Sequence, residues 1–160
     1  MPPAPITLTL QSPEETAALA VRFGRIVQPG DVLLLSGGIG AGKTHFARAL
    51  IQSLQDNFED VPSPTFTLVQ IYETRAGTLW HTDLYRLSHP DEVVELGLTD
   101  VFETAVCLIE WPDRLGPLAP ENALTLAFDL ADEEGTRYIT LSWKTANWDV
   151  RLEEITNAAA

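Results

Sequence analysis

The chain has 160 residues, of which 45% are apolar, a length and composition suited to one domain with one hydrophobic core. No apolar run approaches the roughly 18–20 residues of a membrane span, and the opening Met-Pro-Pro-Ala-Pro lacks the regions of a secretory signal, so we expect no membrane association and a cytoplasmic location. A net charge of −13 with 10 Lys and Arg argues against a broad nucleic-acid surface, and the single cysteine excludes an internal disulfide or a cysteine metal cluster.

The N-terminal segment predicts a strand followed by a helix. Residues 6–10 alternate between apolar and polar side chains, as in a half-buried strand. Ser12, Pro13 and Glu15 then form a capping-box pattern, in which Ser12 is the N-cap, Pro13 the first helical residue and Glu15 the residue that reaches back. The helix is expected to end before Pro29.

A glycine-rich loop between a strand and a helix is the main functional signal. Residues 37–44 read G-G-I-G-A-G-K-T and fit G-x-x-x-x-G-K-[ST], the phosphate-binding loop pattern. An apolar run at 32–35 precedes it, and apolar residues with helical spacing follow it from Lys43 to about Gln55. These flanks favour a nucleoside triphosphate site over a glycine turn without a ligand. The expected phosphate contacts are the backbone of Gly38, Ile39, Gly40, Ala41 and Gly42 and the Lys43 ammonium, with the Thr44 hydroxyl as a magnesium ligand.

A proline-rich loop at 61–64 leads into two strand-like segments, 66–73 and 78–84, which predict an antiparallel hairpin. Thr65 lies where the hairpin begins, and its hydroxyl is either a ligand for magnesium or phosphate or an ordinary strand-start group. Asp83 ends the second strand. It is a candidate to act on magnesium or on a lytic water, and the alternatives are an ion pair with Arg86 or a turn cap.

A second candidate carboxylate follows the buried strand expected at 105–109. Glu110 comes directly after this apolar run, where it is expected to bind magnesium, directly or through water, or to orient the attacking water. The alternative is an exposed carboxylate at a strand end. Trp111 comes next, either as a cover for the nucleotide, as a partner contact or as a packed aromatic.

The remaining patterns complete a mixed α/β sheet. Residues 88–91 begin a short helix that ends at Gly97, and segments 124–130 and 138–143 predict another hairpin. We expect one α/β phosphate-loop NTPase domain over residues 1–144, with helices on the faces of a mixed sheet, and a tail of weak helical character over 145–160. Cys107 is expected in the core, His45 as a neutral helix residue, and His81 and His89 as surface or capping groups.

In chain order the motifs are G-G-I-G-A-G-K-T, S-P-T-F-T-L-V, H-T-D-L-Y-R-L, E-L-G-L and L-I-E-W-P. Together they resemble the bacterial TsaE family, also called YjeE, over residues 6–143. The resemblance implies a small ATPase required for threonylcarbamoyl modification of adenosine 37 in tRNAs. It also implies two protein partners, the transferase TsaD and its scaffold TsaB, with tRNA reached through the complex and ATP hydrolysis serving to reset that complex.

The resemblance also implies roles for individual residues. Gly38 to Lys43 hold the phosphates, Thr44 and Glu110 serve magnesium, and Thr65 and Asp83 occupy switch and catalytic positions. Ser12 falls where the N-terminal segment of the family approaches the nucleotide. The family often has G-D-L-G in its loop, whereas this chain has Ile39 in place of the acid.

Two other functions fit the glycine-rich loop. A small-molecule kinase would need an acceptor pocket and arginines over the phosphates, and arginine is scattered after the loop. A nucleotide-gated binding module with negligible hydrolysis fits because no strong general base is evident in the sequence. The acidity of the chain has two interpretations, solubility or docking to a basic partner.

Overall fold

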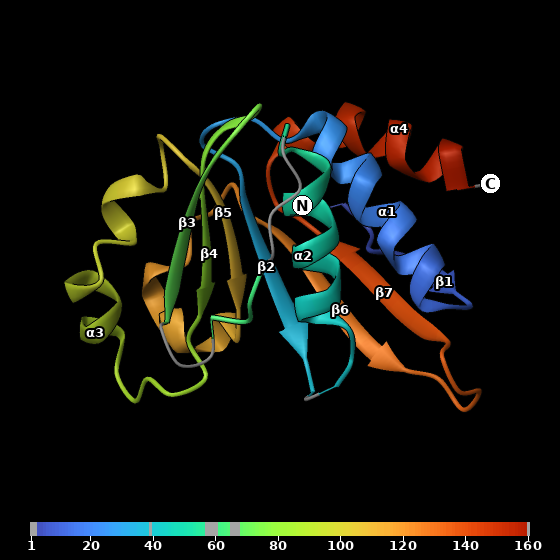
Figure 1. Cartoon of the computed structure of the whole chain (residues 1–160), viewed down its shortest axis with the longest axis horizontal. Coiled ribbons are helices and arrows are strands. Elements are labelled where there is room, and N and C mark those ends of the chain that lie inside the picture. The colour runs from blue at the N-terminus through green and yellow to red at the C-terminus, as the bar shows by residue number, and fades with distance from the viewer. Residues whose placement is uncertain (1–2, 39, 57–60, 65–67, 160) are drawn as a thin grey trace.

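The computed structural model describes residues 3–38, 40–56, 61–64 and 68–159. Within these residues the chain forms one seven-stranded sheet with helices on both faces (Figure 1). The strands are β1 (Ile6–Leu10), β2 (Val32–Gly37), β3 (Val69–Thr74), β4 (Gly77–Asp83), β5 (Val106–Glu110), β6 (Leu124–Leu130) and β7 (Arg137–Ser142). The helices are α1 (Pro13–Ile26), α2 (Lys43–Ser53), α3 (Pro90–Glu95) and α4 (Asp149–Ala159), with short 3-10 segments η1 (Thr99–Val101), η2 (Pro112–Leu118) and η3 (Ala146–Trp148).

The strands lie in the order β1-β7-β6-β2-β5-β4-β3. The four central strands, β6, β2, β5 and β4, are mutually parallel, whereas β3, β7 and β1 are antiparallel to their neighbours. The apolar runs of β2 and β5 are buried on both faces, as central parallel strands require. Both antiparallel hairpins expected from the sequence are present, so the predicted mixed α/β sheet is confirmed.

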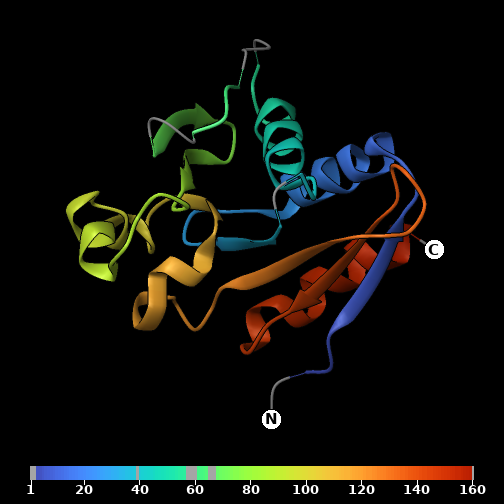
Figure 2. The same cartoon turned by 90° about the horizontal axis from the view of Figure 1, so that it is seen from below.

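Helices α1 and α2 cover one face of the sheet, and α3 with η2 covers the other (Figure 2). Alternation along β2 divides its side chains between the two cores: Leu33 and Leu35 face α1 and α2, and Val32 and Leu34 face the opposite side. The same alternation in β4 and β5 decides which of their polar residues face α2.

The helix starts follow the sequence signals with small differences. Ser12 caps α1 by accepting a hydrogen bond from the N–H of Glu15 at 3.2 Å, but the Glu15 carboxylate reaches the N–H of Gln11 and not that of Ser12. At the start of α3, His89 is the N-cap and its Nδ1 accepts from the N–H of Asp91. Helix α2 ends at Ser53, two residues earlier than expected.

The C-terminal segment belongs to the same core as the rest of the chain. Trp148, Leu152 and Ile155 are almost completely buried and pack in the core that lies under α1 and α2. Arg151 on α4 forms an ion pair with the buried Asp31, with Nη1 3.0 Å from Oδ1. No helix in the described part of the chain is both long and apolar enough to cross a membrane.

Candidate nucleotide-binding site

The turn from β2 into α2 presents an uncapped helix N-terminus. Gly37, Gly40 and Gly42 have φ angles of 135°, 79° and 105°, in the region that favours glycine. Gly42 is the N-cap of α2, and no side chain caps this helix with a hydrogen bond. The N–H groups of its first turn are therefore available to an anion, where the helix dipole also favours negative charge.

Lys43 lies buried beside this turn. Its Nζ donates to the carbonyl oxygen of Gly37 at 2.7 Å and lies 3.5 Å from the centre of the Trp111 ring. Burial lowers the pKa of Lys43 from its usual value, and the negative charges of Glu110, Asp83 and Asp113 oppose that shift. A cation in this environment gains further stabilisation from an anion placed at the turn.

The two predicted carboxylates meet next to the lysine. Because β4 and β5 are parallel neighbours, Asp83 and Glu110 are register partners at their carboxyl ends, and both are buried, with 4% and 2% of their surfaces exposed. The alternative of an exposed Glu110 is therefore wrong. Asp83 also accepts a hydrogen bond from the N–H of Tyr85 at 2.9 Å, so it caps a turn as well as lying in the site.

Both oxygens of Glu110 have partners. The Thr44 hydroxyl donates to Oε1 at 2.7 Å, and His81 Nε2 lies 2.7 Å from Oε2. The expectation that His81 is a surface or capping group is wrong, because its side chain is completely buried. A sequence signal existed: alternation along a strand places His81 on the same face as Asp83, two residues later.

The donors present at this point fit a magnesium ion. Thr44 and Glu110 supply adjacent oxygen atoms, which Mg²⁺ prefers, and it commonly takes one or two protein ligands and completes its shell with phosphate and water. Among the described residues, no group of three or more His, Cys, Asp or Glu side chains is arranged to hold a metal ion. The oxygen pair suits a metal bound together with a nucleotide.

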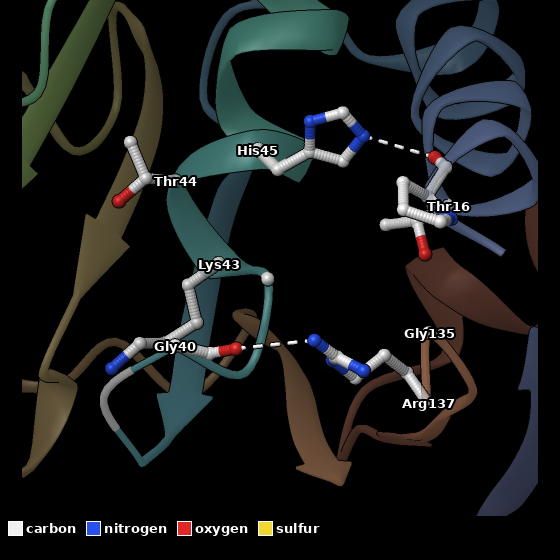
Figure 3. A pocket seen from close by; sticks show the side chains of 9 residues that line it. Thr16, Gly40, Lys43, Thr44, His45, Gly135 and Arg137 are labelled. Carbon is white, nitrogen blue, oxygen red and sulfur yellow. Dashed lines mark hydrogen bonds between the residues drawn. The ribbon is translucent and has the colours of Figure 1, made fainter. Parts of the chain in front are cut away.

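A pocket of about 400 Å³ opens on the other side of the loop. Figure 3 shows Thr44 and the Lys43 ammonium on one side of the turn and Arg137 on the other. The residues that line the pocket come from three elements: Pro13 and Thr16 of α1, Gly40, Gly42, Lys43, Thr44 and His45 of the loop and α2, and Gly135 and Arg137 of the β6–β7 hairpin. A nucleoside attached to phosphates at the loop would have room here.

Sequence reasoning missed most of these pocket residues. Arg137 donates from Nε to the carbonyl oxygen of Ala41 at 3.1 Å and from Nη2 to that of Gly40 at 3.3 Å. His45 Nε2 lies 2.9 Å from the carbonyl oxygen of Pro13 and so connects α2 to the start of α1. Thr16 and Arg137 belong to no motif, because only folding brings them to the loop. Ser12 does not line this pocket as the structure describes it, and its hydroxyl caps α1.

The remaining candidates have different outcomes. Thr65 and Ile39 lie outside the described residues. Trp111 is half-buried between Lys43 and Tyr85, with the Tyr85 and Trp111 ring centres 4.8 Å apart, so it packs at the site. Cys107 is a buried core residue as expected, and burial raises the pKa of its thiol to about 12.

Comparison with known proteins identifies relatives over most of the chain. The family model described as "Threonylcarbamoyl adenosine biosynthesis protein TsaE" matches residues 10–139. A tRNA threonylcarbamoyladenosine biosynthesis protein TsaE of Rickettsia bellii is 38% identical over 125 residues, 78% of this chain and 87% of the relative. The protein of that name in Bacillus subtilis is 35% identical over 145 residues, 90% and 89% of the two chains. The crystal structure of Bacillus subtilis YdiB matches with a TM-score of 0.80 and 28% identity over 100% of this chain and 99% of that one, which agrees with the expected phosphate-loop NTPase fold.

Proposed function

This chain belongs to the TsaE family of threonylcarbamoyl adenosine biosynthesis proteins, and we propose that it binds and hydrolyses magnesium-ATP in support of that modification of tRNA. The observation that carries the proposal is the meeting of Lys43, Thr44, Glu110 and Asp83 at the carboxyl ends of three parallel strands. Ligands of open α/β sheets bind at this edge.

The proposed chemistry assigns a separate task to each group. The N–H groups at the start of α2 and the Lys43 ammonium bind the phosphates and stabilise negative charge as the terminal phosphate leaves. Thr44 and Glu110 would hold magnesium, which when bound would neutralise charge on the phosphate oxygens. Asp83 orients a water molecule whose oxygen bonds to the terminal phosphorus while the bond to the bridging oxygen of ADP breaks, and the water's protons leave with the inorganic phosphate and to solvent. Thr65 remains a candidate switch residue.

The nucleoside is proposed to occupy the pocket between α1 and the β6–β7 hairpin. Thr16 and His45 supply polar groups there, and Arg137 supports the loop from the same side. Ser12 affects this region by starting α1, whose first turn forms one wall of the pocket.

The partners proposed are TsaD and TsaB, with tRNA reached through them in the cytoplasm. The net charge of −13 supports this division, because direct tRNA binding draws on Lys and Arg that the chain largely lacks. ATP hydrolysis then changes the complex between turnovers and takes no direct part in threonylcarbamoyl transfer.

The test combines nucleotide binding with turnover. Lys43→Ala should weaken ATP binding roughly 10- to 100-fold, since a charge-assisted contact contributes about 1.5–3 kcal/mol. Lys144→Ala, at the only other lysine and on the surface, is the matched control and should bind normally. Asp83→Asn and Glu110→Gln should retain ATP binding and lose most turnover. The control Asp129→Asn, at an exposed carboxylate, should retain both ATP binding and turnover.

Turnover is measured for the chain alone and with TsaB and TsaD, alongside modification of tRNA. Binding of ATP without hydrolysis in either condition would favour the nucleotide-gated module instead. Phosphorylation of a metabolite by the wild-type chain would favour the kinase. Many rounds of tRNA modification without this chain would contradict the proposed role in turnover.

A further inference from the structure

His81 lies in direct contact with the proposed magnesium site but is not one of its ligands. Its ring is fully buried on β4, and Nε2 lies 2.7 Å from Oε2 of Glu110. The other Glu110 oxygen accepts from Thr44 on α2. The carboxylate is therefore held from two elements at once, a neighbouring strand and the helix after the loop.

The surroundings of the ring define its tautomer. Nδ1 of His81 is buried and has no hydrogen-bond partner in the part of the chain that the structure describes. A proton on Nδ1 would be buried without an acceptor, which costs more than leaving a lone pair unmet. We therefore assign the ring proton to Nε2, which donates to Glu110.

Strand register explains why this contact forms. In the parallel pair β4–β5, His81 is opposite Leu108 and Asp83 is opposite Glu110. Alternation places all four side chains on the face covered by α2, so His81 is the diagonal neighbour of Glu110. The H-x-D spacing in β4 thus brings a hydrogen-bond donor and a carboxylate to the same site.

We propose that His81 is a positioning residue for the magnesium site: by holding Oε2 of Glu110, it keeps Oε1 directed at Thr44. This inference rests on the proposed function, in which Thr44 and Glu110 serve the metal. Groups that hydrogen-bond to metal ligands orient them, and their removal typically lowers metal affinity about 10- to 100-fold. A purely structural role would instead affect stability and leave metal binding unchanged.

The experiment measures Mn²⁺ binding, as a magnesium substitute, by electron paramagnetic resonance at saturating ADP. Three variants differ in the donor that they present: His81→Gln places an amide N–H near the Nε2 position, His81→Asn falls short of Glu110, and His81→Leu has no donor. We expect Mn²⁺ binding to be about 10-fold weaker in His81→Leu and His81→Asn, and His81→Gln to retain most of the Mn²⁺ affinity. ADP affinity in EDTA should change by less than about twofold in all three, because Lys43 and the loop are untouched.

Thr82→Val is the matched control. Thr82 is the next residue on β4, is equally buried and faces the opposite core, so its replacement perturbs the strand without touching Glu110. It should leave Mn²⁺ binding unchanged. If His81→Leu does not fold, the comparison of His81→Gln with His81→Asn tests the proposal, since both variants carry an amide and differ in the length of the side chain.

Three results would overturn the inference. They are a wild-type Mn²⁺ affinity for His81→Asn, an Mn²⁺ affinity of His81→Gln no higher than that of His81→Asn, or a loss of ADP affinity in EDTA as large as the loss of Mn²⁺ affinity. A wild-type chain that binds ADP but shows no metal binding would overturn the proposed magnesium site and this inference with it. If the wild-type chain binds Mn²⁺ and the His81 variants bind it equally well, the positioning role alone is overturned and the proposed magnesium site stands.

Discussion

Gly37 is the residue at which backbone geometry limits the phosphate loop most tightly. Its φ of 135° lies in the glycine region, and an added Cβ would overlap the carbonyl oxygen of Phe128 on the neighbouring strand β6. Gly38 differs, because an added Cβ would meet none of the described atoms within 4 Å and its φ lies outside the glycine region. Glycine is therefore required at Gly37 by the fold itself, whereas at Gly38 the fold leaves space for a phosphate to approach.

This contrast predicts different effects for two alanine substitutions. Gly37→Ala should lower the free energy of unfolding by about 2–4 kcal/mol, because strained φ and backbone overlap add together. Gly38→Ala should lower it by less than about 1 kcal/mol. Urea denaturation of both variants in the absence of nucleotide is the measurement, and equal losses would contradict this account of the turn.

Arg137 connects two elements, the β6–β7 hairpin and the phosphate loop. It is the first residue of β7 and donates to the carbonyl oxygens of Gly40 and Ala41. In a trans peptide the C=O and N–H point in opposite directions, so holding the Ala41 oxygen turns the N–H of Gly42 to the other side of the turn. The hairpin thereby orients the Gly42 N–H, a candidate hydrogen-bond donor to phosphate.

Arg137→Met should therefore weaken ATP binding about 5- to 10-fold, because a misoriented Gly42 N–H loses most of one ordinary hydrogen bond, worth about 1–1.4 kcal/mol. Stability should fall by about 1–3 kcal/mol, since Gly40 is exposed but the carbonyl oxygen of the buried Ala41 loses its donor. Arg25→Met, at an exposed arginine on α1, is the control and should bind ATP normally. Isothermal titration calorimetry checks both variants, and a normal affinity for Arg137→Met would exclude the support role.

At the scale of the whole molecule, the C-terminal segment is part of the folded unit. Trp148 is fully buried, its Nε1 donates to the carbonyl oxygen of Asn122 at 2.8 Å, and the Arg151 guanidinium lies 4.2 Å from its ring. Arg151 also pairs with Asp31 just before β2. The segment therefore stabilises the strand that leads into the phosphate loop.

Trp148→Ala should destabilise the protein by about 3–5 kcal/mol, the usual cost of emptying a large buried site. Truncation after residue 144 should cost at least as much. Val150→Ala, at a side chain that is 70% exposed, should change stability by less than about 0.5 kcal/mol. Thermal and urea unfolding provide the measurements, and a stable truncated chain would show that the tail is dispensable for folding.

Local signals in the sequence were sufficient for the strands and α-helices near the site, but not for η2, the 3-10 segment that follows Trp111. The apolar run of β2, the glycine pattern and the helical spacing of α2 act over a few residues, and so do the Ser12 cap and the two hairpins. The carboxylates were found because each ends a predicted strand, with an apolar run leading directly into Glu110, and the carboxyl ends of parallel strands lie at one edge of a sheet. The sequence by itself therefore determined the α/β class, the phosphate loop, and Lys43, Thr44, Asp83 and Glu110 as candidates.

Tertiary structure decided the contacts between elements that lie far apart in the chain. Strand order and register placed His81 against Glu110, and the path of the β6–β7 hairpin placed Arg137 on the loop, 96 residues from its partner Ala41. Packing also made the tail part of the core. Such contacts depend on how whole elements pack, which no short pattern encodes, and so the sequence indicated the loop and its carboxylates but not the groups that hold them.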